Sequence, residues 1–276
     1  MRKMLPVFRH RFGPLAVLGS ILFTLSFITR LVLMIMSWSN LELSVLRVIG
    51  IFFIGAFYDL VVFSFFAIPV ALYCWLMKDS WYQKKWQRIP LFFLFFIITL
   101  ILVVNVGGEI IFWDEFNVRY NFIAVDYLVY TNEVLGNIWE SYNVVLIIAA
   151  VLVVTFIILA LVRKKLVASQ QVSMRFGRRS LFFFCFMLLP VAGYFLVNNR
   201  LKNTSSNNYV NELGGNGIYE FGAAFWHNEI DYNKFYATRN DTANIKLLRQ
   251  MLQAPNATFS NDPLSIERQI QNDSPE

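Results

Sequence analysis

Five stretches of this chain are long and apolar enough to cross a lipid bilayer as helices, and they limit the fold more than any other feature. A helix needs about 20 mostly apolar residues to span the hydrocarbon. The second stretch is long enough to tilt or to extend past the lipid, and the fifth is the shortest and contains Pro190. The predicted spans cover residues 13–38, 46–76, 89–111, 142–162 and 181–197.

The composition agrees with a membrane protein. Of 276 residues, 57% are hydrophobic and 15% are charged, whereas soluble domains carry about 25% charged residues. The first apolar run is too long for a typical cleaved signal peptide and lacks a small-residue cleavage site, so we expect it to be retained. The sequence therefore predicts an all-α membrane protein with five transmembrane helices, external amphipathic interfacial helices and a polar C-terminal linker.

The net charge of +6 does not indicate nucleic-acid binding, because the cations cluster beside the apolar runs. The segments at 39–44 and 107–140 carry no cation except Arg119. By the positive-inside rule the N-terminus is expected in the cytoplasm and residues 198–276 outside. The cations that support this orientation are Arg2, Lys3, Arg9, Arg11, Lys78, Lys84, Lys85, Arg88, Arg163, Lys164, Lys165, Arg175, Arg178 and Arg179.

Two charged residues lie inside predicted spans, Arg30 in the first and Asp59 in the second. A lone charge at mid-membrane costs about 2.5–3.5 kcal/mol, which favours pairing. Their expected depths differ by roughly 8 Å, and a long arginine side chain covers part of that gap. The pair is either a structural pin or part of a polar cavity open to lipid headgroups or ions. Transport is disfavoured, because we expect no further charged or broken-helix element within the spans.

Residues 120–141 are predicted to form an external amphipathic helix, either in the membrane interface or packed against the spans. Arg119, Asp126, Glu133 and Glu140 follow one another at seven-residue intervals, which on a helix makes one stripe. This helix is either a connector or a surface that contacts lipid headgroups or an external domain. The opposite, mostly apolar face comprises Ala124, Leu128, Thr131, Leu135 and Ile138.

The tail changes composition at Asn198. A second interfacial helix is expected at 217–236, preceded by a flexible hinge at Gly214–Gly217. The hinge is not a phosphate loop, because it lacks a preceding strand and a lysine. A short helix is expected near 243–252, with a linker after it, and the lone His227 is not expected to be a ligand.

The chemistry-bearing residues form no recognisable active site in the sequence. Cys74 and Cys185 fall within apolar runs without partners at metal-ligand spacing, so both are interpreted as buried small hydrophobic residues. There is no nucleophile–base pair, metal cluster or phosphate cradle, and we predict no catalytic and no metal-binding residue.

Two segments resemble a known family. "EIIFWDEFNVRYNFIAVDYLVYTNEVLGNIWESYN" at 109–143 closely resembles a segment of bacterial lipoteichoic acid synthase-like proteins, also described as sulfatase-like phosphoglycerol transferases. "NELGGNGIYEFGAAFWHNEIDYNKFYAT" at 211–238 resembles the segment before their catalytic domain. The resemblance covers nearly the whole chain but only the family's N-terminal half. It gives an external family-signature face comprising Glu115, Arg119, Asn121, Asp126, Tyr130, Glu133 and Asn137.

The resemblance implies a function without catalytic residues in this chain. Family members continue into an external alkaline-phosphatase-like domain, where acidic residues and a histidine hold a metal, usually manganese, and a threonine (a modified cysteine in true sulfatases) is the nucleophile. No such position exists here, so no catalytic residue is carried over, no cofactor is expected in this chain, and we expect it to be inactive alone.

We therefore expect a membrane-anchor and lipid-side module in the bacterial cytoplasmic (inner) membrane. Its expected partners are membrane lipid and an alkaline-phosphatase-like domain or partner chain, with no nucleic acid. The alternative is a non-catalytic membrane protein that binds lipid or assembles with an envelope-biogenesis enzyme. A small transporter is a third, less favoured hypothesis.

Overall fold

The computed structural model describes residues 5–41, 44–226 and 241–271. The chain divides into one unit at 1–228 and a second at 229–276. The described residues are mostly helical, and they include five helices long and apolar enough to cross a membrane, as the sequence predicts. These are α1 (Gly13–Met36), α2 (Val45–Phe66), α5 (Arg88–Phe116), α8 (Val144–Ser169) and α9 (Phe176–Leu196).

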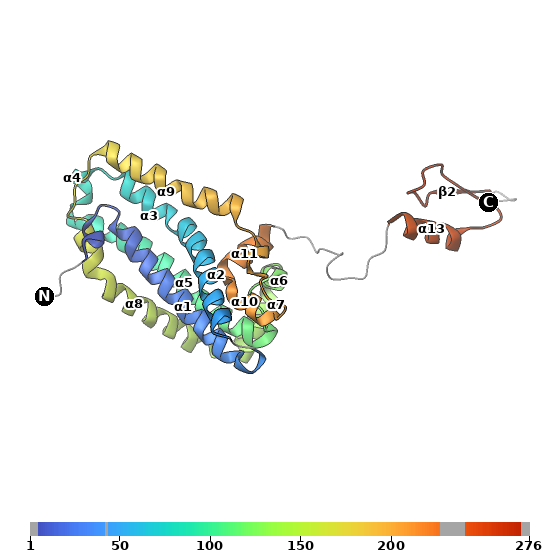
Figure 1. Ribbon diagram of the computed structural model, residues 1–276, viewed down its shortest axis with the longest axis horizontal. Coiled ribbons are helices and arrows are strands. Elements are labelled where there is room, and N and C mark those ends of the chain that lie inside the picture. Colours follow the sequence, from blue (N-terminus) through green and yellow to red (C-terminus); the bar gives the residue numbers. More distant parts are fainter. Residues whose placement is uncertain (1–4, 42–43, 227–240, 272–276) are drawn as a thin grey trace. The chain divides into compact units, whose positions relative to one another are not determined.

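The long helices of the first unit form a bundle (Figure 1). Helix α5 packs against α1 and α8, and α2 packs against α1 and α9. The apolar core of the bundle includes Leu18 and Leu22 of α1, Phe95 of α5 and Leu166 of α8. Other faces leave large apolar side chains exposed, such as Phe53 and Leu161, as expected where lipid is the solvent.

The second predicted span is not one helix. It consists of α2 and a shorter helix, α3 (Ile68–Leu76), which meet at Ala67. Pro69 lies in the first turn of α3 and has no N–H to donate to the preceding turn, which ends the regular hydrogen-bond series there. Pro190, in contrast, lies inside α9 without ending it.

Three helices extend beyond the predicted spans, because a helix does not have to end where the lipid ends. Helix α5 continues to Phe116, α8 continues through its cations to Ser169, and α9 begins at Phe176 rather than at 181. Lysine and arginine are good helix formers and carry their charge out to water on long stems. Cys74 is buried as predicted, but Cys185 is exposed because its position on α9 faces away from the core.

One end of the bundle, called the basic end here, holds several of the cations that support the predicted orientation, among them Arg11 and Arg179. Asp79 begins α4 (Asp79–Tyr82) and lies 3.1 Å from Arg11 and 3.8 Å from Arg179. The Arg11 guanidinium lies 3.5 Å from the centre of the Tyr82 ring, a cation–π arrangement. Two short 3-10 helices, η1 (Pro6–Arg9) and η3 (Lys85–Gln87), complete this end.

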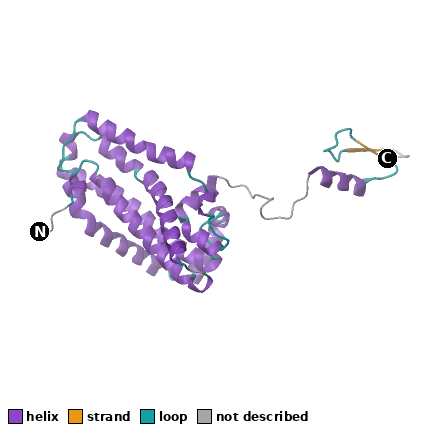
Figure 2. Ribbon diagram, in the orientation of Figure 1, coloured by secondary structure: helices purple, strands orange, loops and turns teal. Residues whose placement is uncertain are grey.

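The opposite end carries the shorter helices (Figures 1 and 2). They are η2 (Trp38–Asn40), α6 (Phe122–Val129), α7 (Thr131–Ser141), η4 (Asn199–Lys202), α10 (Asn208–Gly214) and α11 (Gly217–Trp226). Helix α11 starts where the sequence predicts it and packs on α2, α5 and α6. The rest of that predicted helix, with His227, lies outside the described residues.

The single amphipathic helix predicted at 120–141 is wrong, because α6 and α7 are separate helices. The backbone leaves helical geometry at Tyr130, with φ −95° and ψ 43°. Helix α6 buries Ala124 and Val125, whereas the side chains described on α7 are exposed or half-buried. Only the first half of the segment is therefore held by packing against the bundle.

The second unit contains α13 (Asp241–Leu252) and an antiparallel hairpin of β1 (Ala257–Phe259) and β2 (Arg268–Ile270). Arg249 holds it together by donating to the carbonyl oxygens of Ser260 (2.9 Å) and Ser265 (2.8 Å). The sequence predicts a linker after α13, but part of that segment forms the hairpin. The sequence does not reveal the strands, because three residues are too few to show an alternating pattern.

Candidate functional site

The two charges predicted inside the spans are paired. Arg30 Nη1 lies 3.0 Å from Asp59 Oδ2, and Arg30 Nη2 lies 3.0 Å from Asp59 Oδ1. The side chains are 2% and 3% exposed, respectively. Two parallel N–H···O bonds are the strongest arrangement that a guanidinium and a carboxylate can make. The geometry fits the structural pin that the sequence leaves as one of two interpretations.

The turn between α10 and α11 supplies the remaining hydrogen-bond partners of Arg30 and Asp59. Arg30 donates from Nε to the Leu213 carbonyl (3.1 Å) and from Nη2 to the Gly215 carbonyl (3.1 Å). Asn216 Nδ2 donates to Asp59 Oδ1 at 2.7 Å. The flexible hinge predicted at Gly214–Gly217 is therefore wrong: these residues are buried, and the guanidinium needs their carbonyl oxygens as acceptors.

Helix α2 makes room for the guanidinium at Gly55. A Cβ atom at this position would overlap the Cζ, Nε and Nη2 atoms of Arg30. Any side chain larger than hydrogen would therefore displace the arginine from Asp59, one turn further along α2.

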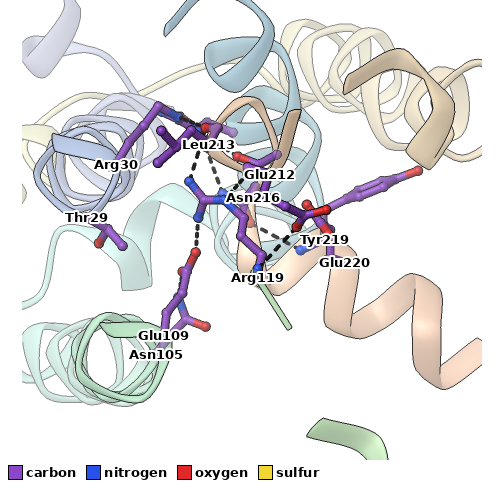
Figure 3. Close-up of polar contacts among 12 residues, drawn as sticks. Thr29, Arg30, Asn105, Glu109, Arg119, Glu212, Leu213, Asn216, Tyr219 and Glu220 are labelled. Carbon is purple, nitrogen blue, oxygen red and sulfur yellow. Dashed lines mark hydrogen bonds and ion pairs between the residues drawn. The ribbon is translucent and has the colours of Figure 1, made fainter. Parts of the chain in front are cut away.

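Arg119 forms a second buried pair, with Glu109 of α5 (Figure 3). Its Nε donates to the Glu212 carbonyl at 2.8 Å, and its Nη2 donates to the Leu213 carbonyl at 3.3 Å. Asn117, in left-handed conformation with φ 55°, ends α5 and redirects the chain. Asparagine tolerates this conformation better than most residues. Arg119 therefore points into the bundle rather than along an external helix.

The external face predicted for the signature residues is not one face. Glu115 is exposed at the end of α5, and Asn121 caps α6 by accepting from the Ile123 N–H at 2.9 Å. Asp126 is half-buried on α6, whereas the remaining members lie exposed at the break or on α7. The seven-residue spacing would align them only on one unbroken helix. Of the predicted set, the structure brings Arg119 into a buried ion pair and leaves the other six outside it: Glu115, Asn121, Asp126, Tyr130, Glu133 and Asn137.

A third buried cluster was not predicted. Lys202 Nζ lies 2.7 Å from Glu212 Oε1 and 2.5 Å from Glu220 Oε2. These residues come from η4, α10 and α11. The sequence predicts a polar stretch, a hinge and an interfacial helix there, but no ion pair. Glu109, in contrast, was detectable: it lies within the predicted third span, so the expectation that the spans hold no further acid is wrong.

Burial changes the proton affinities of this network. Burial, together with the nearby Arg30 charge, lowers the pKa of Arg119 to about 10, and neighbouring carboxylates oppose this shift. Burial raises the pKa of Glu220 to about 7, and Lys202 opposes that shift. The three pairings together form what we call the ionic network: Arg30, Asp59, Glu109, Arg119, Lys202, Glu212, Asn216 and Glu220.

The cavity beside the ionic network is small. Thr29 of α1, Asn105 of α5 and Arg119 are among its lining residues, and its volume is about 10 Å³, room for about one water molecule. A headgroup does not fit there, and most donors of Arg30 and Arg119 already have acceptors. Among the described residues, no group of three or more His, Cys, Asp or Glu side chains is arranged to hold a metal ion.

A larger groove, of about 410 Å³, lies where α2 begins. Its lining combines apolar residues of α2, among them Leu46 and Ile54, with the hydroxyl-bearing segment 204–206. Arg47 also lines it. This groove is open and half polar, unlike the tightly filled ionic network.

No protein-family model, curated protein or solved structure matches this chain. Its five candidate spans and helical fold show a multi-pass helical membrane protein. The ionic network joins the first three spans to the segment that follows the fifth.

Proposed function

We propose that this chain is the membrane module of an envelope enzyme similar to the lipoteichoic acid synthase-like phosphoglycerol transferases. In this proposal it anchors an external catalytic unit and holds the start of the connection to that unit in a fixed position. The module itself performs no chemistry. A divalent metal such as manganese would belong to the external unit.

One observation carries the proposal: the two segments that resemble the family meet in the ionic network. Glu109 and Arg119 come from the first segment, and Glu212 and Leu213 come from the second. Arg119 contacts Glu212 although the two residues are 93 positions apart in the chain. Two quoted segments that carry the resemblance and lie far apart in the sequence are expected to meet when they have one structural task together.

The network supports a rigid attachment rather than a loose tether. After α9, residues 198–226 are fixed to the bundle at several points. Tyr58 of α2 donates to the Asn198 carbonyl at 2.6 Å, and Tyr219 donates to the Val197 carbonyl at 2.8 Å. Asn207 donates to the Asn40 carbonyl at 2.9 Å. The chain is thus held to the bundle into the first turns of α11, where Tyr219 and the buried Glu220 lie.

The proposed orientation follows from charge. The cations of the basic end would face the cytoplasm, and the ionic network would lie near the external surface of a bacterial cytoplasmic membrane. The connection to the external unit would then start on the side where an outer-leaflet lipid headgroup is exposed. This position suits transfer of a headgroup from a membrane lipid to an envelope acceptor.

The direct experiment starts from the gene. The reading frame after codon 276 is sequenced, and the longer product is reconstituted in phosphatidylglycerol vesicles with manganese. We expect an alkaline-phosphatase-like domain and release of diacylglycerol. Arg119→Gln should lower this turnover while membrane insertion is unchanged, and Arg200→Gln, at an exposed position, is the control. A locus without such a domain, or a longer product without turnover, contradicts the proposal.

A second candidate function, a non-catalytic lipid-binding protein, is favoured by the groove where α2 begins. The groove places hydroxyl groups of 204–206 beside apolar residues of α2, among them the exposed Leu46. Native mass spectrometry of the full chain from membranes tests it. Retained lipid that is lost in a Ser205→Leu/Ser206→Leu variant would favour this function, and lipid retention unchanged by the substitutions would count against it.

A further inference from the structure

Glu220 has a carboxylate oxygen without a partner. The residue is 5% exposed, and its Oε2 accepts from Lys202 Nζ at 2.5 Å. Its Oε1 is buried and has no hydrogen-bond partner among the residues that the structure describes. This oxygen lies against the backbone at Gly215, where a Cβ atom would overlap it. A buried carboxylate oxygen without a donor is costly while it carries charge.

The ionic network also has an excess of negative charge. Arg30 balances Asp59, and Arg119 balances Glu109. Lys202 remains with two carboxylates, Glu212 and Glu220. With every carboxylate ionised, the third cluster therefore carries one uncompensated negative charge. Such a charge is expensive to keep away from water unless it binds a cation or a proton.

The groups around Glu220 indicate which carboxylate of the cluster takes up a proton to neutralise the excess negative charge. Helix α11 packs on α2, α5 and α6. Lys202 is the cation in direct contact with Glu220, and Glu212 shares it. The titratable or charged groups on the elements around it include Lys202 on η4, Glu212 on α10, Tyr58 and Asp59 on α2, Glu109 on α5, Asp126 and Tyr127 on α6, Tyr219 on α11 itself, and Arg119 and Tyr120 in the loop before α6.

We propose that Glu220 is a proton-binding site whose occupancy controls how firmly α10 and α11 are seated on the bundle. When the two helices are seated, Oε1 takes one proton from solvent, and the charge of the Lys202–Glu212–Glu220 cluster becomes neutral. When the proton returns to solvent, the excess charge favours release of α11 and exposure of Glu220 to water. This inference does not depend on the proposed enzyme, because it concerns only contacts within this chain.

The direction of the pH dependence follows from the two states. Burial raises the pKa of Glu220 from 4.5 to about 7 in the seated state, and an exposed Glu220 has its ordinary value. The seated state therefore binds the proton more tightly and is most favoured below about pH 4.5. As the pH rises to about 7, the seating equilibrium weakens by up to roughly a hundredfold and then levels off.

Hydrogen exchange of the full chain in lipid nanodiscs tests the proposal. Amide protection of residues 208–226 is measured across this pH range and corrected for the intrinsic pH dependence of exchange. We expect protection of α10 and α11 to fall by up to roughly a hundredfold, with α5 unaffected. Glu220→Gln should make the protection independent of pH, since the amide is neutral at every pH. Glu133→Gln, at an exposed position, is the matched control and should behave like the wild type.

Infrared spectroscopy gives a second measurement that does not require exchange by local opening. A protonated carboxyl band should disappear from the wild-type spectrum as the pH rises through about 7. It should be missing in Glu220→Gln and present in Glu133→Gln. The proposal is overturned if wild-type protection is independent of pH, if Glu220→Gln keeps the wild-type pH dependence, or if the band persists in Glu220→Gln.

Discussion

Asn216 Nδ2 lies 2.7 Å from Asp59 Oδ1, so the carboxylate that pairs with Arg30 between two spans also binds the turn between α10 and α11. The bundle and the segment after its last span therefore share one polar centre. Disturbing any part of that centre is expected to affect both.

Gly55→Ala should destabilise the bundle, because its Cβ atom would overlap the Arg30 guanidinium. Overpacking a filled core typically costs about 1–3 kcal/mol, and displacement of the guanidinium from Asp59 adds to it. Thermal unfolding in detergent measures the loss. Gly50→Ala is the matched control on the same helix, since no other part of the described chain lies within 4 Å of its Cβ position. Equal melting temperatures for the two variants would contradict the packing described at Gly55.

Asp59→Ala should cost about 3–5 kcal/mol, because it leaves a buried arginine without its carboxylate. Arg30→Ala should also destabilise, and the double variant should cost less than the sum of the single losses. The free energies of unfolding, measured with denaturant in mixed micelles, complete a double-mutant cycle. Additive losses would mean that the two side chains do not interact.

Glu133→Ala should leave membrane insertion and bundle stability unchanged within about 0.5 kcal/mol, because Glu133 is exposed on α7. In a longer gene product, the Asp126→Ala/Glu133→Ala double variant should lower headgroup transfer if this region contacts a headgroup or the external domain. Insertion assays and turnover measured side by side separate the two effects. Unchanged turnover would leave α6 and α7 as a connector.

Arg249→Ala should disorder the second unit without changing the bundle. Its guanidinium binds carbonyl oxygens of the segment between the strands and lies 5.3 Å from the centre of the Phe259 ring. Removing it leaves those carbonyls without their donor. Limited proteolysis should cut residues 257–270 faster, whereas Lys246→Ala, an exposed position on the same helix, should be cut at the wild-type rate. Equal cleavage of both variants would show that Arg249 does not order the hairpin.

The features correctly predicted from the sequence are those that depend on neighbouring residues or on the energetic cost of placing a group in lipid. Apolar length alone identifies the five spans. The cost of an isolated charge in lipid is sufficient to predict that Arg30 and Asp59 pair. Glu109 was detectable by the same argument, because it is an acidic residue inside the predicted third span. In the structure Asn105, four residues earlier on the same helix, donates to it at 3.3 Å.

The missed features depend on partners far away in the chain. Seven-residue spacing placed Arg119 on an external stripe, but the left-handed turn at Asn117 and the carbonyls of Glu212 and Leu213 decide its direction. Local composition makes the stretch from Asn198 to Gly217 look like a polar segment that ends in a flexible hinge. Its Lys202 is buried because Glu212 and Glu220 converge on it from two later helices, which no local pattern reveals.

The order of synthesis gives the ionic network a further consequence. Arg30 is made first, its carboxylate partner follows 29 residues later, and its acceptor at Leu213 follows 183 residues later. The first two spans can pair as they emerge, but the guanidinium obtains its remaining acceptors only after the fifth span has been made. Assembly of the bundle therefore finishes with the segment beyond its last span, so a ribosome must complete that segment before the membrane domain reaches its final structure.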